Sequence, residues 1–116
     1  MKRCNELDDE KQVDESLIAA FHQMWDGFPG LARLIDKQHV VLASNKSAAE
    51  TGFIEGVVCA RVLSPQAHKG CLAHTALKTK TARVDRTADN KIRGWMPLAG
   101  HDELFVHFTL AIPEGI

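Results

Sequence analysis

SNKSAAETGFIEGVVCARVLSPQAHKGCLAHTA, residues 44 to 76, is the segment around which the rest of the chain is organised. It has a helical composition and lies between two parts that are rich in β-forming residues. It also holds two of the three cysteines and two of the six histidines, namely Cys59, Cys71, His68 and His74. If the protein senses or binds something, we expect the site in this segment.

The composition is that of an ordinary globular protein. The chain has 116 residues, 45% of them hydrophobic and 25% charged, which is enough for one domain with a single core. Its net charge of −1 gives no reason to expect nucleic acid or an anionic membrane surface as a partner.

No targeting or membrane-spanning segment is apparent in the sequence. No apolar run approaches the ~20 residues that a transmembrane helix needs. The first residues turn acidic at Glu6, where a signal peptide would have an apolar core. We therefore expect a cytoplasmic protein without a membrane span. In that compartment three cysteines indicate free thiols, metal ligands or redox groups before structural disulfides.

Residues 8–26 are predicted to form an amphipathic helix. Its apolar residues recur at steps of three and four and so line one stripe: Val13, Leu17, Ile18, Phe21, Met24 and Trp25. Acidic residues lie at its start, where the helix dipole favours negative charge, and Gly27 follows its end. This stripe must be buried against the protein's own sheet or against a second copy of the chain.

A hairpin and short helices are expected next. Leu31–Asp36 and His39–Ser44 are β-forming runs joined by a turn. Asn45 is placed to cap a short helix that Gly52 ends in a left-handed conformation.

A second helix and then three strands complete the predicted elements. Ser64-Pro65 is a favourable helix start, and the helix is expected to reach about Lys80 with Gly70 as a weak point. The strands are predicted at residues 81–87, 91–98 and 103–112. The last strand is long and apolar on both faces, which indicates a central position in its sheet.

This order of elements resembles a PAS domain. Leu34-Ile35-Asp36 followed by His39–Asn45 is similar to the first hairpin of that family, with its aspartate turn and the asparagine after the second strand. Ala48–Phe53 is similar to the family's A-x-E-x-x-G-[YF] helix, shortened by one residue, and Gly56 matches the glycine that usually follows. The likeness covers residues 16–113.

The resemblance implies an α+β fold. It consists of a five-stranded antiparallel sheet of order 2-1-5-4-3, with connecting helices over one face and an N-terminal amphipathic helix. Residues 1–15 would be an acidic tail and the start of the lead-in helix, residues 16–113 the sensor domain, and residues 114–116 a C-terminal tail. The family works as sensory and dimerisation modules and rarely does chemistry. The resemblance therefore implies a homodimer, a signalling output domain or partner protein, and no enzyme activity.

The cysteines and histidines resemble a motif found in a subset of PAS domains, G-x-x-C followed by C-x-x-C. Gly56-Val57-Val58-Cys59 matches the first part, and His68-Lys69-Gly70-Cys71 matches the second with histidine in place of one cysteine. Residues three apart on a helix point the same way, so His68 and Cys71 are candidates to share a ligand with Cys59, and His74 is a candidate fourth group. Such groups suit zinc or an iron–sulfur centre. The alternative is that the cysteines are inert core residues.

Flavin and haem are weaker candidates as cofactors. Cys59 has the spacing from Gly56 that resembles the photoactive cysteine of flavin-binding LOV domains, but the residues that would hold the flavin ring are absent. Haem would require an axial histidine. The candidates are His22, His39, His68, His74, His101 and His107, of which the last lies mid-strand among apolar neighbours.

We therefore expect a sensory module that binds a small molecule, a metal or a redox centre under its connecting helices. The pocket is expected to be mainly apolar and to be lined by Leu34, Val41, Phe53, Val62, Leu72, Leu77, Met96, Val106 and Phe108. The alternative is a pure dimerisation module with a filled core. An enzyme with Cys59 or Cys71 as nucleophile is disfavoured because no acid stands near in sequence to orient a base. The identity of the ligand stays open.

Overall fold

Five strands form one antiparallel sheet in the order β2-β1-β5-β4-β3, as the resemblance implied. The computed structural model describes residues 15–62, 68 and 70–113. In chain order its elements are α2 (Glu15–Trp25), β1 (Leu31–Asp36), β2 (Val41–Ser44), α3 (Lys46–Thr51), the 3₁₀ turn η1 (Cys59–Arg61), α4 (Ala73–Thr79), β3 (Arg83–Arg86), β4 (Lys91–Leu98) and β5 (His101–Ala111).

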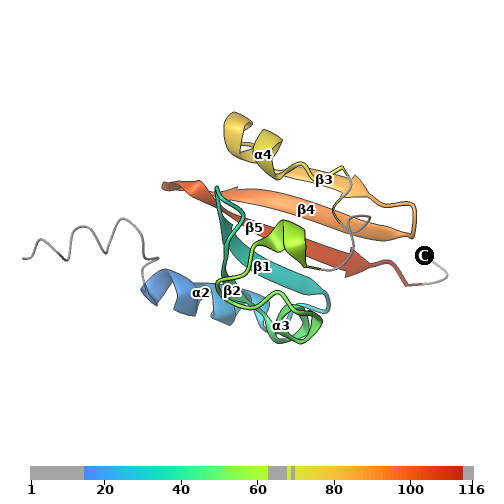
Figure 1. Ribbon diagram of the computed structural model, residues 1–116, viewed down its shortest axis with the longest axis horizontal. Coiled ribbons are helices and arrows are strands. Elements are labelled where there is room, and N and C mark those ends of the chain that lie inside the picture. The colour runs from blue at the N-terminus through green and yellow to red at the C-terminus, as the bar shows by residue number, and fades with distance from the viewer. Residues whose placement is uncertain (1–14, 63–67, 69, 114–116) are drawn as a thin grey trace, which may run out of the picture.

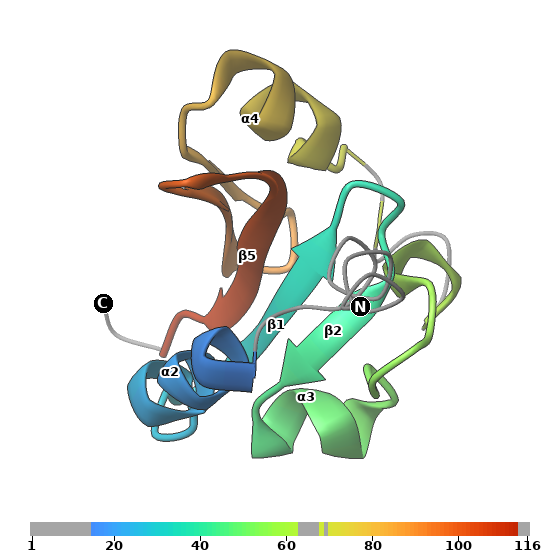
Figure 2. The ribbon, with the colours of Figure 1, turned by 90° about the vertical axis from the view of Figure 1, so that its left-hand side faces the viewer.

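Helical segments cover both faces of this sheet. Figures 1 and 2 show α2 against one face, here called the outer face, while α3, η1 and α4 lie over the other, the inner face. β5 pairs with β1 on one side and β4 on the other. Its predicted central position is therefore confirmed. Two cores result, one on each side of the sheet.

The outer core is closed by α2. Trp25 stacks on Phe108 of β5 with ring centroids 6.0 Å apart, and Phe28 meets both rings edge-on. The fully buried members of this core are Phe21, Ala32, Leu34, Ala43 and Val106. Four residues of the apolar stripe predicted for the lead-in helix therefore pack against the protein's own sheet: Leu17, Ile18, Phe21 and Trp25. Met24 was predicted in the same stripe but is 71% exposed, and Val13 lies outside the described residues.

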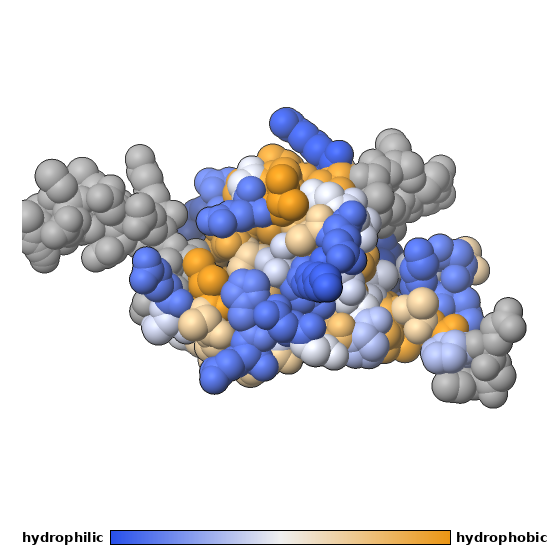
Figure 3. All heavy atoms as spheres, turned by 90° about the horizontal axis from the view of Figure 1, so that it is seen from below, coloured by the Kyte–Doolittle hydropathy of each residue, from blue (hydrophilic) through white to orange (hydrophobic). Residues whose placement is uncertain are grey.

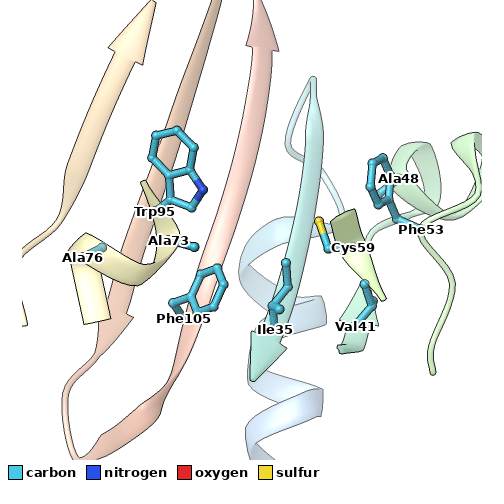
Figure 4. Packing of buried hydrophobic residues seen from close by; sticks show 9 residues of the cluster. All are labelled: Ile35, Val41, Ala48, Phe53, Cys59, Ala73, Ala76, Trp95 and Phe105. Carbon is cyan, nitrogen blue, oxygen red and sulfur yellow. The ribbon is translucent and has the colours of Figure 1, made fainter. Parts of the chain in front are cut away.

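The inner core joins the sheet to the connecting segment, which is the part of the chain between β2 and β3, residues 45–82 (Figure 4). Its buried members are Ile35, Val41, Ala48, Phe53, Cys59, Ala73, Ala76, Trp95 and Phe105. They come from four of the five strands, from α3, η1 and α4, and from the residues just after α3. Because burying one large apolar side chain contributes about 1.5–3 kcal/mol, this cluster holds the connecting segment on the sheet.

Asn45 ties the lead-in segment to α3. Its Oδ1 accepts hydrogen bonds from the amides of Ala48 at 3.0 Å and Ala32 at 3.2 Å, so the predicted helix cap is confirmed. Its Nδ2 donates to the carbonyl oxygens of Trp25 at 3.2 Å and Gly30 at 3.0 Å. The side chain is buried and fully used, and it joins three segments that are distant in sequence.

The connecting segment agrees with the sequence up to α3 and then differs. Gly52 ends α3 with φ 112°, as predicted. The helix expected from Ser64-Pro65 to Lys80 is described only from Ala73, as α4. Gly70 adopts φ 76°, a left-handed conformation that cannot continue an α-helix. The expected helix start at residues 64–65 lies outside the described residues, as do the acidic residues 8–14 and the tail 114–116.

Candidate functional site

A small cavity lies between the inner face of the sheet and the connecting segment. Its volume is about 120 Å³, below the roughly 300–1,000 Å³ of pockets that take drug-sized ligands. Its apolar walls are Ile35, Ala60, Ala73, Trp95 and Phe105. Its polar lining residues are His39, Cys59, His68, Cys71, Arg93 and His107. This lining contains an arginine and three histidines and no acidic residue.

Trp95 and His107 form one wall of the cavity. They face each other across β4 and β5, and their rings stack with centroids 4.8 Å apart and planes within 8°. His107 Nδ1 donates to the carbonyl oxygen of Gly94 at 2.8 Å. The pKa of His107 is lowered well below its usual value, mainly by burial and secondly by the charge of Arg33. His107 is therefore a neutral imidazole at pH 7.

The indole N–H of Trp95 has no hydrogen-bond acceptor among the residues that the structure describes. The Trp95 side chain is 0% exposed, so water does not solvate this donor from outside. Figure 4 shows the nitrogen on the edge of the ring that faces the side where Cys59 lies. A buried donor without an acceptor costs about 1–3 kcal/mol. Such groups are rare in native proteins, and a bound water molecule or ion is one of their explanations.

Arg93 lies beside Trp95 at the edge of the cavity. Its guanidinium carbon is 5.1 Å from the centre of the indole ring. Nε and Nη2 donate to the carboxylate of Asp85 at 3.0 and 2.6 Å, in a two-pronged ion pair between β4 and β3. No hydrogen bond joins Nη1 to the described residues, so part of the guanidinium keeps donor capacity.

Arg33 is a second buried cation on the inner face. Its side chain is 2% exposed. Nε donates to the carbonyl oxygen of His107 at 3.3 Å, Nη2 donates to the Thr109 hydroxyl at 3.0 Å, and the guanidinium lies 4.3 Å from the centre of the Phe53 ring. Burial lowers the pKa of Arg33 to about 10, so it is charged at pH 7. No carboxylate of the described residues pairs with it.

Three of the four predicted metal ligands line this cavity, and the fourth does not. Cys59 is buried, Cys71 is exposed and His68 is half-buried. His74 lies on the exposed side of α4, outside the cavity lining. Among the described residues no group of three or more histidine, cysteine or acidic side chains is close enough to hold a metal ion.

The single helix assumed for two of the metal ligands is not found, while the metal site itself stays a prediction. The predicted geometry required one helix to carry both His68 and Cys71, but Gly70 breaks the helix between them. The ring nitrogen Nε2 of His68 instead donates to the backbone carbonyl of Val62. Burial is the main cause that raises the pKa of Cys59, so its thiol is protonated at neutral pH in the protein without a metal.

The nine predicted pocket residues divide between the two faces of the sheet. Val41, Phe53, Val62, Leu72 and Leu77 belong to the inner core that surrounds the cavity. Leu34, Met96, Val106 and Phe108 lie on the outer face, packed with the lead-in helix segment, which corrects their predicted position. None of the nine lines the cavity itself. The reason is that β4 and β5 are apolar on both faces, so alternation alone does not tell which face meets the connecting segment.

Sequence reasoning missed several residues of the site. Arg93, Trp95 and Phe105 were not singled out. His107 was noted as a mid-strand histidine. Trp95 is its partner on β4, so the two side chains lie on the same face of the sheet. A buried arginine is not visible in a sequence because arginine is usually exposed.

The sheet order, the three connecting helical segments on one face and the lead-in helix on the other define a PAS-like α+β fold. The chain is similar to a solved structure described as a sensory box sensor histidine kinase from Vibrio cholerae. The TM-score is 0.61 and the sequence identity 10%, with 96% of each chain covered. This likeness shows the fold. No protein-family model and no curated protein sequence matches the chain significantly.

Proposed function

We propose that this PAS-like domain is a sensory module that binds a small molecule on the inner face of its sheet. The observation that carries the proposal is the cavity of about 120 Å³ lined by Trp95, His107 and Arg93. It lies between the sheet and the connecting segment, where a bound molecule would contact both. Occupancy would then change how tightly the connecting segment is held.

The cavity favours ligand binding over the alternative of a filled core. Core packing in proteins is dense, and spaces larger than one water molecule are few in a domain. The polar groups around this space make it unlike a dry packing defect, which is lined by apolar side chains. Its volume leaves no room for a haem or flavin ring, so the ligand is smaller than either cofactor.

The proposed role does not include catalysis. Burial raises the pKa of Cys59, which is the opposite of what a nucleophilic cysteine needs. His107 donates Nδ1 to a backbone carbonyl, and no carboxylate of the described residues orients it as a base.

We further propose that the module acts through a second copy or an output domain. Most of the described stripe on α2 is already packed against the sheet, and Met24 at 71% exposure is the large apolar side chain of this stripe that is left in solvent. Figure 3, seen from the side of α2 and α3, shows apolar residues scattered among hydrophilic ones. In the described part of the chain no helix has the length and apolar character needed to cross a membrane. Light scattering of the whole chain and of Met24→Lys tests a dimer formed through this helix.

Thermal shift measurements test ligand binding directly. A panel of small organic acids, neutral apolar molecules, metal salts, haem and flavin is added to the whole chain. We expect at least one class of small molecule to raise the melting temperature, because a ligand that binds only the folded state stabilises it. Metal analysis and a visible absorption spectrum of freshly purified protein, handled without oxygen, test the metal and cofactor alternatives. No shift from any compound and no bound cofactor would contradict the proposal.

A further inference from the structure

The permanently charged side chain that lines the cavity is a cation, and its carboxylate partner Asp85 lies outside the lining. Arg93 lines it, Arg33 lies in the same inner core, and the described lining residues include no acid. Burial of a cation without an opposite charge is costly, and native proteins usually pair such a group. Arg93 is paired with Asp85, whereas no carboxylate of the described residues pairs with Arg33.

The surroundings of His107 are consistent with the positions of the two arginines. Besides burial, the charges of Arg33, Arg93 and His68 all lower its pKa. Burial is the larger cause, but a nearby cation that opposes protonation of an imidazole also attracts an anion.

Unused hydrogen-bond donors lie at the same place. The indole N–H of Trp95 has no acceptor among the described residues, and Arg93 Nη1 forms no hydrogen bond to them. The guanidinium and the indole are neighbours, with 5.1 Å between the guanidinium carbon and the ring centre. A carboxylate accepts several hydrogen bonds and carries the negative charge that the site lacks.

We infer that the cavity binds a short-chain carboxylic acid as its anion, with the carboxylate between Arg93 and the indole N–H of Trp95. This inference rests on the proposed function and specifies the ligand class. Arg33 does not line the cavity, so its charge attracts the anion only at long range and it acts as a positioning residue.

The size and the apolar walls restrict the rest of the ligand. A volume of about 120 Å³ admits only a few heavy atoms beyond the carboxylate. Ile35, Ala60 and Phe105 present hydrocarbon surface, which favours a short alkyl group over a second charge. Propionate has this composition and serves as the probe.

The first experiment follows the two indole N–H signals of the whole chain by NMR during titration with sodium propionate. Trp25 lies on the outer face and is the internal control. We expect the Trp95 signal to move and the Trp25 signal to stay. Sodium chloride at equal ionic strength controls for screening, and propionamide has the same shape without the charge. Because charge-assisted hydrogen bonds are about twice as strong as neutral ones, propionamide is expected to bind at least about tenfold more weakly.

Three variants test which side chains bind the carboxylate. Trp95→Phe keeps an aromatic ring and removes the N–H, and Arg93→Met removes the cation, so each is expected to weaken propionate binding by about tenfold or more. Asp85→Asn removes the carboxylate that competes for Arg93, and we expect it to strengthen binding. A merely structural role of the Arg93–Asp85 pair would make both of its variants bind more weakly. If Trp95→Phe does not fold, the other two variants still test the inference, because Arg93→Met is expected to weaken propionate binding and Asp85→Asn to strengthen it.

The outcomes separate this inference from the proposed function. Equal binding of propionamide and propionate, or an Arg93→Met variant with unchanged affinity, overturns the carboxylate assignment. Binding of benzene without binding of propionate also overturns it, while the proposed small-molecule sensor stands. If neither compound binds, and no other member of the panel does, both proposals fail.

Discussion

The imidazole ring of His107 lies flat against the indole ring of Trp95, with ring centroids 4.8 Å apart and planes within 8°. The two residues occupy paired positions on β4 and β5, so the sheet register itself creates the stack. This contact, together with the hydrogen bond to the Gly94 carbonyl, holds a neutral histidine in the wall of the cavity.

His107 is expected to make stability fall in acid. Burial lowers its pKa, and the charges of Arg33, Arg93 and His68 act in the same direction. The unfolded chain takes up this proton near pH 6.5, whereas the folded protein resists it. The free energy of unfolding should therefore decrease as the pH falls below about 6.5, by up to about 1.4 kcal/mol per pH unit for this one group. Urea unfolding between pH 5 and 8 measures the slope.

The control for this prediction is His107→Gln, whose amide is able to donate to the same carbonyl but does not titrate. Its pH slope should be shallower than that of the wild type. Equal slopes in the two proteins would contradict the assignment to His107.

Asn45→Ala is expected to be strongly destabilising. It removes an N-cap worth about 1 kcal/mol and leaves the amide of Ala32 and two carbonyl oxygens without their partner, so we expect a loss of at least about 2 kcal/mol. Lys46→Ala, at an exposed neighbouring position, is the matched control and should change little. Chemical denaturation measures both, and equal losses would refute the role given to Asn45.

Gly94→Ala tests the close approach of β4 to the outer core. An added Cβ would lie 2.3 Å from Cζ of Phe108, so this ring must shift, and its stack with Trp25 is disturbed. We expect a loss of about 1–3 kcal/mol from overpacking. Gly27→Ala is the control because no atom lies within 4 Å of its added Cβ. A Gly94→Ala melting temperature equal to that of the control would show that the outer core is looser than described.

The cysteines are expected to differ in reactivity. Cys71 is exposed, whereas Cys59 is buried and burial raises its pKa. Iodoacetamide at pH 7.5 should therefore modify Cys71 first and reach Cys59 only when the inner core opens. Mass spectrometry of the digested protein gives the two rates separately. Rapid modification of Cys59 at low denaturant concentration would count against a closed inner core.

Local patterns were sufficient to predict most elements. The cap at Asn45 and the left-handed Gly52 are set by interactions within a few residues, so their sequence signals were reliable. The strand bounds agree to within two residues, because alternation and turn residues are also local. The helix expected from residue 64 onward is the exception. Gly70 was noted there as a weak point, and its left-handed conformation excludes α-helix at that position.

The sequence by itself determined the two stripes of β5 and the amphipathic character of α2, because period and composition are properties of the chain alone. Only the tertiary structure decided that Phe105 and His107 face the connecting segment while Val106 and Phe108 face α2. Both stripes are apolar enough to be buried, so the sequence does not show which stripe faces α2 and which faces the connecting segment. That depends on the side of the sheet that each covering helix occupies. For the same reason the juxtaposition of Arg33, Arg93 and Trp95 arises from strand pairing across more than 60 residues and has no local signal.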